Sequence, residues 1–291
     1  MAIILDGRSV SSKIVEELRA KTQELKMKGI SPTLALVLVG DDAYSKRYVD
    51  MKLKRCEEVG VKAILHHVKE AGEREILELL KGLNEDPQVH GVMIQLPLPK
   101  GFDESRVVER ISPEKDVDGL SPSTLGRILL GEEAYLPAGV EAIIELLDRY
   151  QVEWTKKHWV IVGLSNIVGK PLAALLLNRK VTVTACHPDQ EDLGGITRDA
   201  DILVVDVARK WFITAEMVKR NSVIIDNGNN YEEKKVYGDV DFENAKEVAS
   251  AITPVPGGVG PLLVTMLVRN TVKAAEKISV KIEASLSLKG V

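Results

Sequence analysis

The chain has 291 residues, of which 45% are hydrophobic and 28% charged, a composition that excludes disordered, collagen-like and membrane-spanning proteins. Its 39 Lys and Arg and 43 Asp and Glu give a formal charge of -4. No long block of like charge predicts a nucleic-acid or membrane surface, so small-molecule partners are favoured. Cys56 and Cys186 lack the spacing of a disulfide framework or a zinc site, and no signal-peptide pattern is present. A cytoplasmic protein of two domains is therefore expected.

The first half of the chain predicts helices and strands in alternation. Helical spacing of apolar residues predicts an amphipathic helix over residues 12–27, and the continuous apolar run 34–39 predicts a strand buried on both faces. A helix over 43–59, a strand over 61–68, a helix over 73–83 and a strand over 91–96 are expected to follow. This alternation indicates a parallel sheet.

The second half predicts a nucleotide-binding sheet. Residues 97–123 are rich in Pro and Gly and are expected to be loops at the domain junction, after which a helical pattern resumes through Leu146. Strands are predicted over 158–162, 181–184, 201–205 and 222–226, with a helix over 168–177. The last apolar helix, over 261–275, is expected to pack on the first half. The fold class predicted is therefore α/β.

The ends of the predicted strands in the first half carry candidate catalytic side chains. In parallel sheets, ligands bind beyond the carboxyl ends of the strands. Tyr48 and Lys52 are four residues apart on one predicted helix face, an arrangement that suits proton transfer, although a packed tyrosine beside a solvated lysine has the same spacing. Gln95 ends a predicted strand, where it could hold a partner side chain or simply terminate the strand.

The segment Lys115–Gly119 places two carboxylates around a valine. Asp116 and Asp118 could bind a polar heterocycle or a metal, or they could form an Asx-type turn into the next helix. A metal site would need further carboxylate or histidine ligands, and none has convincing spacing. No metal is predicted.

The segment Val162–Pro171 has the pattern of a strand, a glycine turn and a helix. Gly163 permits a tight exit from the strand, and Gly169 permits close approach at the helix start, where free N–H groups favour a phosphate. Leu164 and Pro171 are incompatible with the phosphate loop of an ATPase. His187 follows the next strand, where a structural role is favoured over a catalytic one. Residues 252–261 predict a rigid loop that can approach a flat ligand.

These segments, in this order, resemble the bifunctional methylenetetrahydrofolate dehydrogenase/cyclohydrolase family. The resemblance spans essentially the whole chain. Its carriers are residues 40–52, 89–99, 113–119, 163–171, 238–242 and 252–261. It implies an N-terminal α/β domain plus a Rossmann-like dinucleotide-binding domain with a cleft between them, and a homodimer. The implied folate-binding catalytic domain is residues 1–137 plus 262–291, and the implied NAD(P)-binding domain is residues 138–261.

The resemblance also implies the reaction and its residues. The methylene carbon of a tetrahydrofolate derivative loses a hydride to NADP, and water opens the resulting methenyl cation to 10-formyltetrahydrofolate. In this pattern Lys52 is the general acid/base, Tyr48 stacks on the aminobenzoate, Gln95 orients Lys52, and Asp118 pairs with the pterin. The substrate contacts implied are Tyr48, Lys52, Gln95, Leu96, Pro97, Asp118, Pro256, Gly257 and Gly258. The cofactor contacts implied are Gly163, Leu164, Ser165, Ile167, Val168, Gly169, His187, Pro188, Asn229, Gly257 and Val259.

The chain departs from the family pattern on the cofactor side. Leu164 stands where the family commonly has an arginine, and Pro188 stands where a serine supplies a hydroxyl. Both typical contacts with the 2′-phosphate are missing, so NAD is possible in place of NADP unless Arg179, Lys180 or Arg209 reaches the phosphate. Further departures lie at residues 137–140, 207–208, 226–230 and 260–263.

Three functional hypotheses remain at this point. The leading one is the bifunctional enzyme, because Lys52 and the glycine turn are both retained. The second is a cyclohydrolase with lost or weak dinucleotide binding. The third is a non-catalytic folate- or nucleotide-binding protein.

Overall fold

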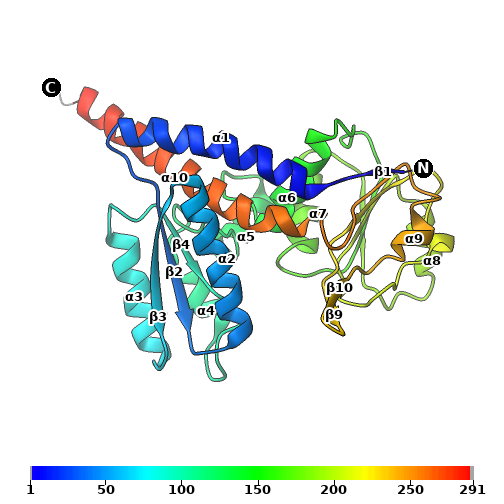
Figure 1. Cartoon of the computed structure of the whole chain (residues 1–291), viewed down its shortest axis with the longest axis horizontal. Helices are drawn as coiled ribbons and strands as arrows, with labels where there is room; N and C mark the ends of the chain where they lie inside the picture. Colours follow the sequence, from blue (N-terminus) through cyan, green and yellow to red (C-terminus); the bar gives the residue numbers. More distant parts are fainter. Residues whose placement is uncertain (1, 289–291) are drawn as a thin grey trace. The chain divides into compact units, whose positions relative to one another are not determined.

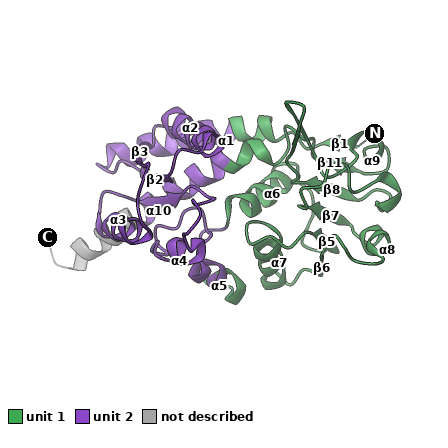
Figure 2. Ribbon diagram, turned by 90° about the horizontal axis from the view of Figure 1, so that it is seen from below, with its two compact units in different colours: residues 1–12, 128–132, 137–263 green, residues 13–127, 133–136, 264–291 purple. Residues whose placement is uncertain are grey.

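The computed structural model describes residues 2–288, with side chains described through Lys277. The chain forms two compact units, which Figure 2 colours separately. Unit 1 comprises residues 1–12, 128–132 and 137–263, and unit 2 comprises residues 13–127, 133–136 and 264–291. Each unit has its own parallel sheet.

Unit 2 is built on three parallel strands in the order β3-β2-β4. The central strand β2 (Thr33–Val39) pairs with β3 (Lys62–Val68) on one side and with β4 (Gly91–Ile94) on the other. Every residue of β2 is buried, which explains its continuous apolar run. The edge strand β3 has no fully buried residue.

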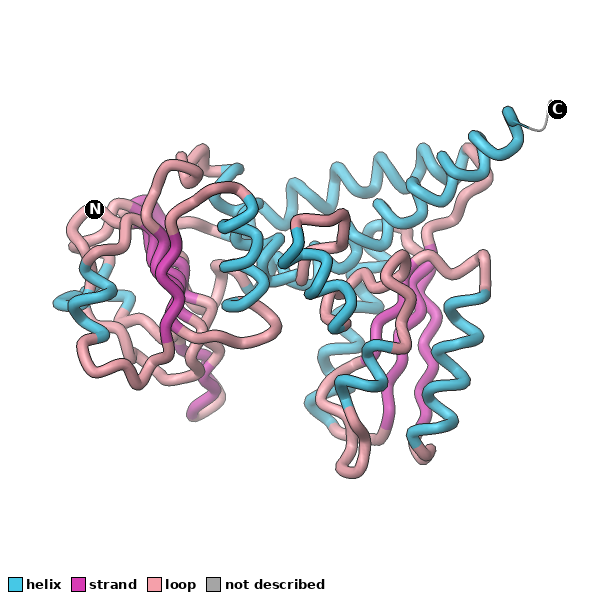
Figure 3. Tube along the Cα trace, turned by 180° about the vertical axis from the view of Figure 1, so that it is seen from behind, coloured by secondary structure: helices cyan, strands magenta, loops and turns pink. Residues whose placement is uncertain are grey.

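Helices cover this sheet and extend along one side of unit 2. They are α1 (Gly7–Met27, in this unit from residue 13), α2 (Ala43–Val59), α3 (Glu73–Glu85), α4 (Glu104–Glu109), α5 (Pro122–Leu130, in this unit to residue 127) and α10 (Gly260–Leu288, in this unit from residue 264). Figures 1 and 3 show α1 and α10 side by side, and an ion pair of 2.6 Å joins Lys21 of α1 to Glu276 of α10.

The final helix is tied into unit 2 by two long-range hydrogen bonds. Arg55 of α2 donates to the Oγ1 atom of Thr265 at 3.0 Å, and the side-chain amide of Asn270 donates to the carbonyl of Val117 at 3.0 Å. Thr265 and Asn270 are both buried. Buried polar side chains of this kind need partners, so these bonds fix the position of α10 within the unit.

Unit 1 contains a six-stranded parallel sheet in the order β1-β11-β8-β7-β5-β6. Its strands are β1 (Ile3–Ile4), β5 (Trp159–Val162), β6 (Val183–Cys186), β7 (Ile202–Val205), β8 (Val223–Asp226) and β11 (Ala251–Ile252). Its other elements are α6 (Ala138–Arg149), α7 (Gly169–Asn178), α8 (Leu193–Arg198), the 3-10 helix η1 (Ala215–Met217), α9 (Phe242–Ala245) and the antiparallel hairpin of β9 (Asn230–Glu232) and β10 (Lys235–Tyr237). The central strands β5 and β7 are wholly buried.

The parallel sheets and the α/β class are confirmed, whereas several element boundaries differ from the predictions. The strand expected over 181–184 is β6 at Val183–Cys186, and the strand expected over 91–96 ends at Ile94. The region 97–123, expected to be loops, includes α4, which is held by the Asp103 side chain at its start. The helical pattern expected to run to Leu146 is interrupted between α5 and α6. None of the helices in the described part of the chain is long and apolar enough to cross a membrane.

Candidate active site

Helix α2 presents its buried side chains toward the sheet of unit 2, and Lys52 lies within that stripe. The helix begins after Asp42, whose carboxylate accepts the N–H of Ser45 at 2.7 Å, and it ends at Gly60. The buried residues of α2 are Ser45, Val49, Cys56 and Val59, which recur at helical spacing. Lys52 falls three residues after Val49 and four before Cys56, so its side chain starts from the sheet-facing side of the helix.

Lys52 contacts the carboxyl end of β4. Its Nζ donates to the Oε1 atom of Gln95 at 2.8 Å and to the Sδ atom of Met93 at 3.3 Å. The Gln95 side chain is only 8% exposed and is oriented by a second bond, from its Nε2 to the carbonyl of Leu96 at 2.6 Å. Lys52 is therefore hydrogen-bonded and only partly exposed, and Gln95 both contacts Lys52 and forms a local bond at the end of the strand.

Burial lowers the pKa of Lys52, and the nearby charge of Asp118 opposes that shift. Burial also raises the pKa of Asp118, against the effect of Lys52. Each group thus disfavours its charged form through desolvation and supports the charge of the other. A lysine with a lowered pKa is a candidate proton acceptor near neutral pH.

Asp116 and Asp118 have separate roles, although the sequence left both alternatives open for the pair. The carboxylate of Asp116 accepts the backbone N–H groups of Gly119 at 3.1 Å and Ser121 at 2.9 Å, so it forms the turn into α5. Asp118 is the partner of Lys52 in electrostatic terms. The carboxylate that forms the turn and the carboxylate that could bind a ligand are therefore two residues apart.

Two aromatic rings lie about one and two helical turns before Lys52. The hydroxyl of Tyr44 donates to that of Tyr48 at 3.0 Å, and their ring centroids are 4.7 Å apart. Tyr44 is 58% exposed and was missed in the sequence, although its position four residues before Tyr48 is a usable signal. Leu96 and Pro97, predicted to contact substrate, directly follow Gln95 in this unit and are joined by a cis peptide bond.

The glycine turn after β5 is tightly packed against its neighbours in unit 1. Gly163 has a φ of 102°, and a Cβ there would lie 2.0 Å from the carbonyl oxygen of Asp206. A Cβ on Gly169, the first residue of α7, would lie 2.0 Å from the carbonyl oxygen of Gly163. The Ser165 hydroxyl accepts the N–H of Val168 at 3.0 Å and donates to Asp206 at 2.8 Å. This tight junction of strand, turn and helix start fits the pyrophosphate of a dinucleotide.

The remaining predicted cofactor residues lie around the carboxyl ends of the same strands, and Pro256–Val259 belong to a loop of unit 1. Leu164 is half-buried, Ile167 is 54% exposed, and His187 and Pro188 follow β6 directly. Asn229 lies between β8 and β9. The N–H of Gly258 donates to the carbonyl of Pro254 at 2.7 Å, and the N–H of Gly7 donates to that of Gly257 at 2.9 Å.

The structure thus groups the predicted residues in two sets. Tyr48, Lys52, Gln95 and Asp118 lie together in unit 2, with Leu96 and Pro97. The glycine turn, the residues after β6 and the loop of Pro256–Val259 lie in unit 1. In the described residues, no group of three His, Cys, Asp or Glu side chains is arranged to hold a metal ion.

Two buried aspartates that sequence reasoning did not single out organise the loops of unit 1. Asp239 accepts three backbone N–H groups, from Val207 at 2.7 Å, Ala208 at 3.2 Å and Arg209 at 2.9 Å. Asp226 accepts the N–H groups of residues 228, 239 and 240. Burial raises the pKa of Asp226 to about 6. These aspartates hold loops in place.

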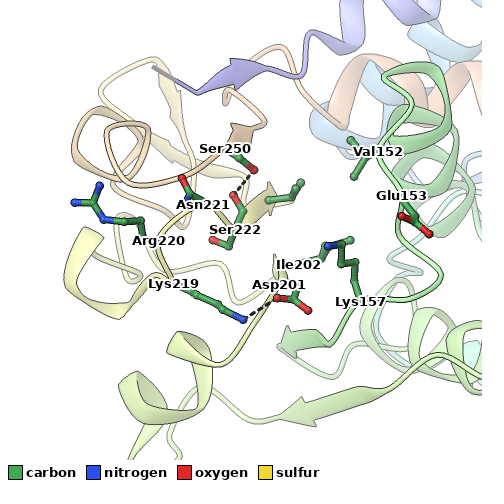
Figure 4. Close-up of a pocket in the computed structure, with 11 residues that line it drawn as sticks. Val152, Glu153, Lys157, Asp201, Ile202, Lys219, Arg220, Asn221, Ser222 and Ser250 are labelled. Carbon is green, nitrogen blue, oxygen red and sulfur yellow. Dashed lines mark hydrogen bonds and ion pairs between the residues drawn. The ribbon is translucent and has the colours of Figure 1, made fainter.

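A separate pocket of about 300 Å³ lies at the end of the unit 1 sheet opposite to the glycine turn (Figure 4). Asp201, Ser222 and Ser250 line it and directly precede β7, β8 and β11, so the pocket lies at the amino ends of these strands. Lys219 donates to Asp201 at 2.7 Å across its floor. None of the residues predicted to bind folate or dinucleotide lines this pocket.

Comparison with known proteins identifies the family. The catalytic domain of tetrahydrofolate dehydrogenase/cyclohydrolase matches residues 5–118, and the NAD(P)-binding domain of that family matches residues 137–279. A "Bifunctional protein FolD" from Halalkalibacterium halodurans is 47% identical over 277 residues, covering 95% of this chain and 99% of that protein. The chain belongs to the tetrahydrofolate dehydrogenase/cyclohydrolase family.

Solved structures of this family agree with the fold. The bifunctional methylenetetrahydrofolate dehydrogenase/cyclohydrolase from Campylobacter jejuni is 43% identical, with a TM-score of 0.93 and coverage of 95% of this chain and 99% of that chain. The enzyme from Trypanosoma brucei, solved with NADP and an inhibitor, is 32% identical, with a TM-score of 0.89 and coverage of 95% and 98%. The family is therefore supported over nearly the whole length of the chain.

Proposed function

We propose that this family member oxidises 5,10-methylenetetrahydrofolate to 5,10-methenyltetrahydrofolate with NADP and hydrolyses the product to 10-formyltetrahydrofolate. The folate-binding catalytic domain is residues 1–137 plus 262–291, and the dinucleotide-binding domain is residues 138–261. In the first step the methylene carbon loses a hydride. In the second, water adds to the methenyl carbon, loses a proton, and the ring opens to the formyl compound.

The part-buried contact of Lys52 with Gln95, at 2.8 Å, is the observation that carries the hydrolytic half of this proposal. A neutral Lys52 amine donates an N–H to Gln95 and keeps its lone pair for the proton that the attacking water releases. The cationic substrate would lower the pKa of Lys52 further, because a like charge disfavours the ammonium. Gln95 acts as a positioning residue, since its own orientation is fixed by its bond to the carbonyl of Leu96.

Folate binding is assigned to residues around Lys52. Asp118, with its raised pKa, can act as donor or acceptor toward the polar edge of a pterin, and the ring of Tyr48 offers a surface on which the aminobenzoate can stack. Leu96 and Pro97 extend this surface after β4. Pro256, Gly257 and Gly258 are proposed as further substrate contacts through their backbone.

The dinucleotide is assigned to the glycine turn after β5. A bound nicotinamide dinucleotide supplies the hydride acceptor, while the protein orients the reacting faces. The close approach of Gly163, Gly169 and Asp206 supports this assignment, because only glycines let the strand end, the turn and the start of α7 pack this tightly. The proposed contacts are Gly163, Leu164, Ser165, Ile167, Val168, Gly169, His187, Pro188, Asn229, Gly257 and Val259. The NAD(P)-binding family model over this region disfavours a hydrolase that has lost its dinucleotide.

We further propose a homodimer in the cytoplasm. The edge strand β3 supports an interface, because its Leu65 side chain is 39% exposed and the strand is open to pairing on one side. Free, buried Cys56 and Cys186 are typical of a reducing compartment. Sedimentation at micromolar concentration tests the dimer.

Turnover of 5,10-methylenetetrahydrofolate tests the dehydrogenase. We expect the methenyl product to accumulate, followed by its absorbance, when NADP is supplied to the full chain, and its decay to the formyl compound to be faster than the spontaneous rate. A parallel assay with NAD measures the second dinucleotide. Absence of turnover with both would contradict the dehydrogenase assignment and leave only the hydrolase.

A further inference from the structure

The carboxyl ends of three neighbouring strands of unit 1 meet at the glycine turn. Strand β5 lies between β6 and β7. The N–H of Gly163 donates to the carbonyl of Cys186 at 3.0 Å, and the N–H of Asp206 donates to the carbonyl of Val162 at 2.9 Å. The chain segments that leave β5, β6 and β7 are therefore adjacent.

An ion pair links the two outer segments. Asp189 is the third residue after β6, and Arg209 is the fourth residue after β7. The Nη1 atom of Arg209 lies 2.7 Å from the Oδ1 atom of Asp189. Because β5 lies between these strands, the pair spans the end of β5 at the glycine turn. The Arg209 side chain holds the pKa of Asp189 below its usual value, so this carboxylate is ionised at neutral pH.

The backbone of Arg209 is fixed, although its side chain is partly exposed. Asp239 accepts the backbone N–H of Arg209 at 2.9 Å and those of the two residues before it. The guanidinium also lies over the ring of Phe212, 5.2 Å from its centre. The backbone at Arg209 is therefore held in place, and a change of partner needs only a rotation of its side chain.

The Asp189–Arg209 pair lies where NAD and NADP are expected to differ. In Rossmann-like sheets, the ribose of the adenosine lies beyond the glycine turn, with its 2′ position facing the residues after the next strand. That position carries a hydroxyl in NAD and a phosphate dianion in NADP. The side chains of Leu164 and Pro188 offer neither a charge nor a hydrogen-bond donor there. The neighbouring cation Lys210 is engaged elsewhere, by Glu232 at 2.5 Å.

We propose that Asp189 and Arg209 determine the preference of this chain between NADP and NAD. Arg209 binds the 2′-phosphate with its planar fork when it leaves Asp189. Asp189 accepts a hydrogen bond from the 2′-hydroxyl of NAD and repels the phosphate. The two side chains compete, so each single substitution shifts the preference in an opposite direction. The inference rests on the proposed dinucleotide chemistry and deepens it.

The test measures binding of two fragments that lack nicotinamide, ADP-ribose and 2′-phospho-ADP-ribose, to the full chain by calorimetry at constant ionic strength. Asp189→Asn frees Arg209 and removes the repulsion, so the affinity ratio should move about tenfold toward the phosphorylated fragment. Arg209→Met should move it about tenfold the other way. Arg209→Lys, which keeps the charge without the fork, should lie between Arg209→Met and the parent.

A matched control is available at the amino ends of the strands of the same sheet. Lys219 forms an ion pair of the same length, 2.7 Å, with Asp201 in the pocket of Figure 4. Lys219→Met should leave the affinity ratio of the two fragments within twofold of the parent. Both side chains of the Asp189–Arg209 pair are partly exposed, so the variants are expected to fold. The melting temperature of each variant checks this.

The outcomes separate the inference from the proposed function. If both fragments bind the parent and the ratio stays within about twofold in Asp189→Asn and Arg209→Met, the inference is overturned while the dinucleotide function stands. If neither fragment binds the parent, the proposed dinucleotide function fails and the inference falls with it. Opposite shifts in the two variants support both.

Discussion

At the scale of single residues, Lys52 combines two properties that suit a proton acceptor. It occupies a sheet-facing position of α2, and its amine is held by Gln95 and Met93. Desolvation lowers its pKa, whereas the charge of Asp118 raises it. The balance of these two effects determines the pH at which Lys52 becomes able to accept a proton.

Asp118→Asn should move the acidic limb of the hydrolysis profile to lower pH. The substitution removes the charge that raises the pKa of Lys52, so the amine loses its proton at a lower pH. The measurement is kcat/KM for methenyltetrahydrofolate between about pH 5 and pH 9, after subtraction of spontaneous hydrolysis. Overall activity should also fall, because Asp118 is a proposed substrate contact.

Glu114→Gln is the control, since Glu114 is exposed on the same segment. Its profile should coincide with that of the parent. A limb that moves to higher pH in Asp118→Asn, or that does not move, would contradict the electrostatic link between the two residues.

The candidate site residues could be singled out from the sequence, whereas most of their surroundings could not. Tyr48, Lys52 and Gln95 could be found because helical spacing and strand ends are local patterns. The partial burial of Lys52 could also be anticipated from the sequence, since Val49 and Cys56 flank it at helical spacing. The division of labour between Asp116 and Asp118 could not be predicted, because it depends on which carboxylate reaches the N–H groups of the turn.

At the scale of elements, the loop after β7 takes its shape from a residue far along the chain. Asp239 lies 30 residues beyond Arg209, yet it accepts the N–H groups of Val207, Ala208 and Arg209. It also accepts the side-chain amide of Asn230 at 2.8 Å. One carboxylate thus connects the β7 loop to the β9–β10 hairpin.

Asp239→Asn should lower the free energy of unfolding by about 1–3 kcal/mol, because the new NH2 group would face backbone donors and leave part-buried N–H groups without an acceptor. Urea unfolding measures this loss. Affinity for ADP-ribose should fall as well, since the loop carries Arg209. Asp241→Asn provides the comparison, because Asp241 bonds only locally to Asn244 among its side-chain contacts, and it should cost less than about 1 kcal/mol. Equal stability of the two variants would contradict this role for Asp239.

The predicted elements show why some boundaries were missed. The buried strands β2 and β7 have continuous apolar sequences and were located closely. Strands β1 and β11 have two residues each, too few to produce a pattern, and they exist because β11 pairs with β8 and β1 pairs with β11. Helix α4 escaped prediction because its six residues follow a Pro- and Gly-rich segment.

At the scale of the whole molecule, the proposed activities draw on two units with separate cores. Unit 2 holds Lys52, the proposed proton acceptor of hydrolysis, and unit 1 holds the glycine turn that we propose for the dinucleotide. Hydride transfer depends on positioning, whereas hydrolysis depends on a group that accepts a proton. A substitution that removes only the proton acceptor should therefore separate the two activities.

The most direct measurement is the rate of both steps in Lys52→Met, which keeps a long side chain but removes the amine. Hydrolysis of methenyltetrahydrofolate should fall by about 10²-fold or more, which is the usual contribution of a general acid/base. Oxidation of methylenetetrahydrofolate with NADP should fall by less than about tenfold, and binding of ADP-ribose should confirm that unit 1 is intact. Hydrolysis that survives in this variant at the parent rate would contradict the account, because another group would then have to accept the proton.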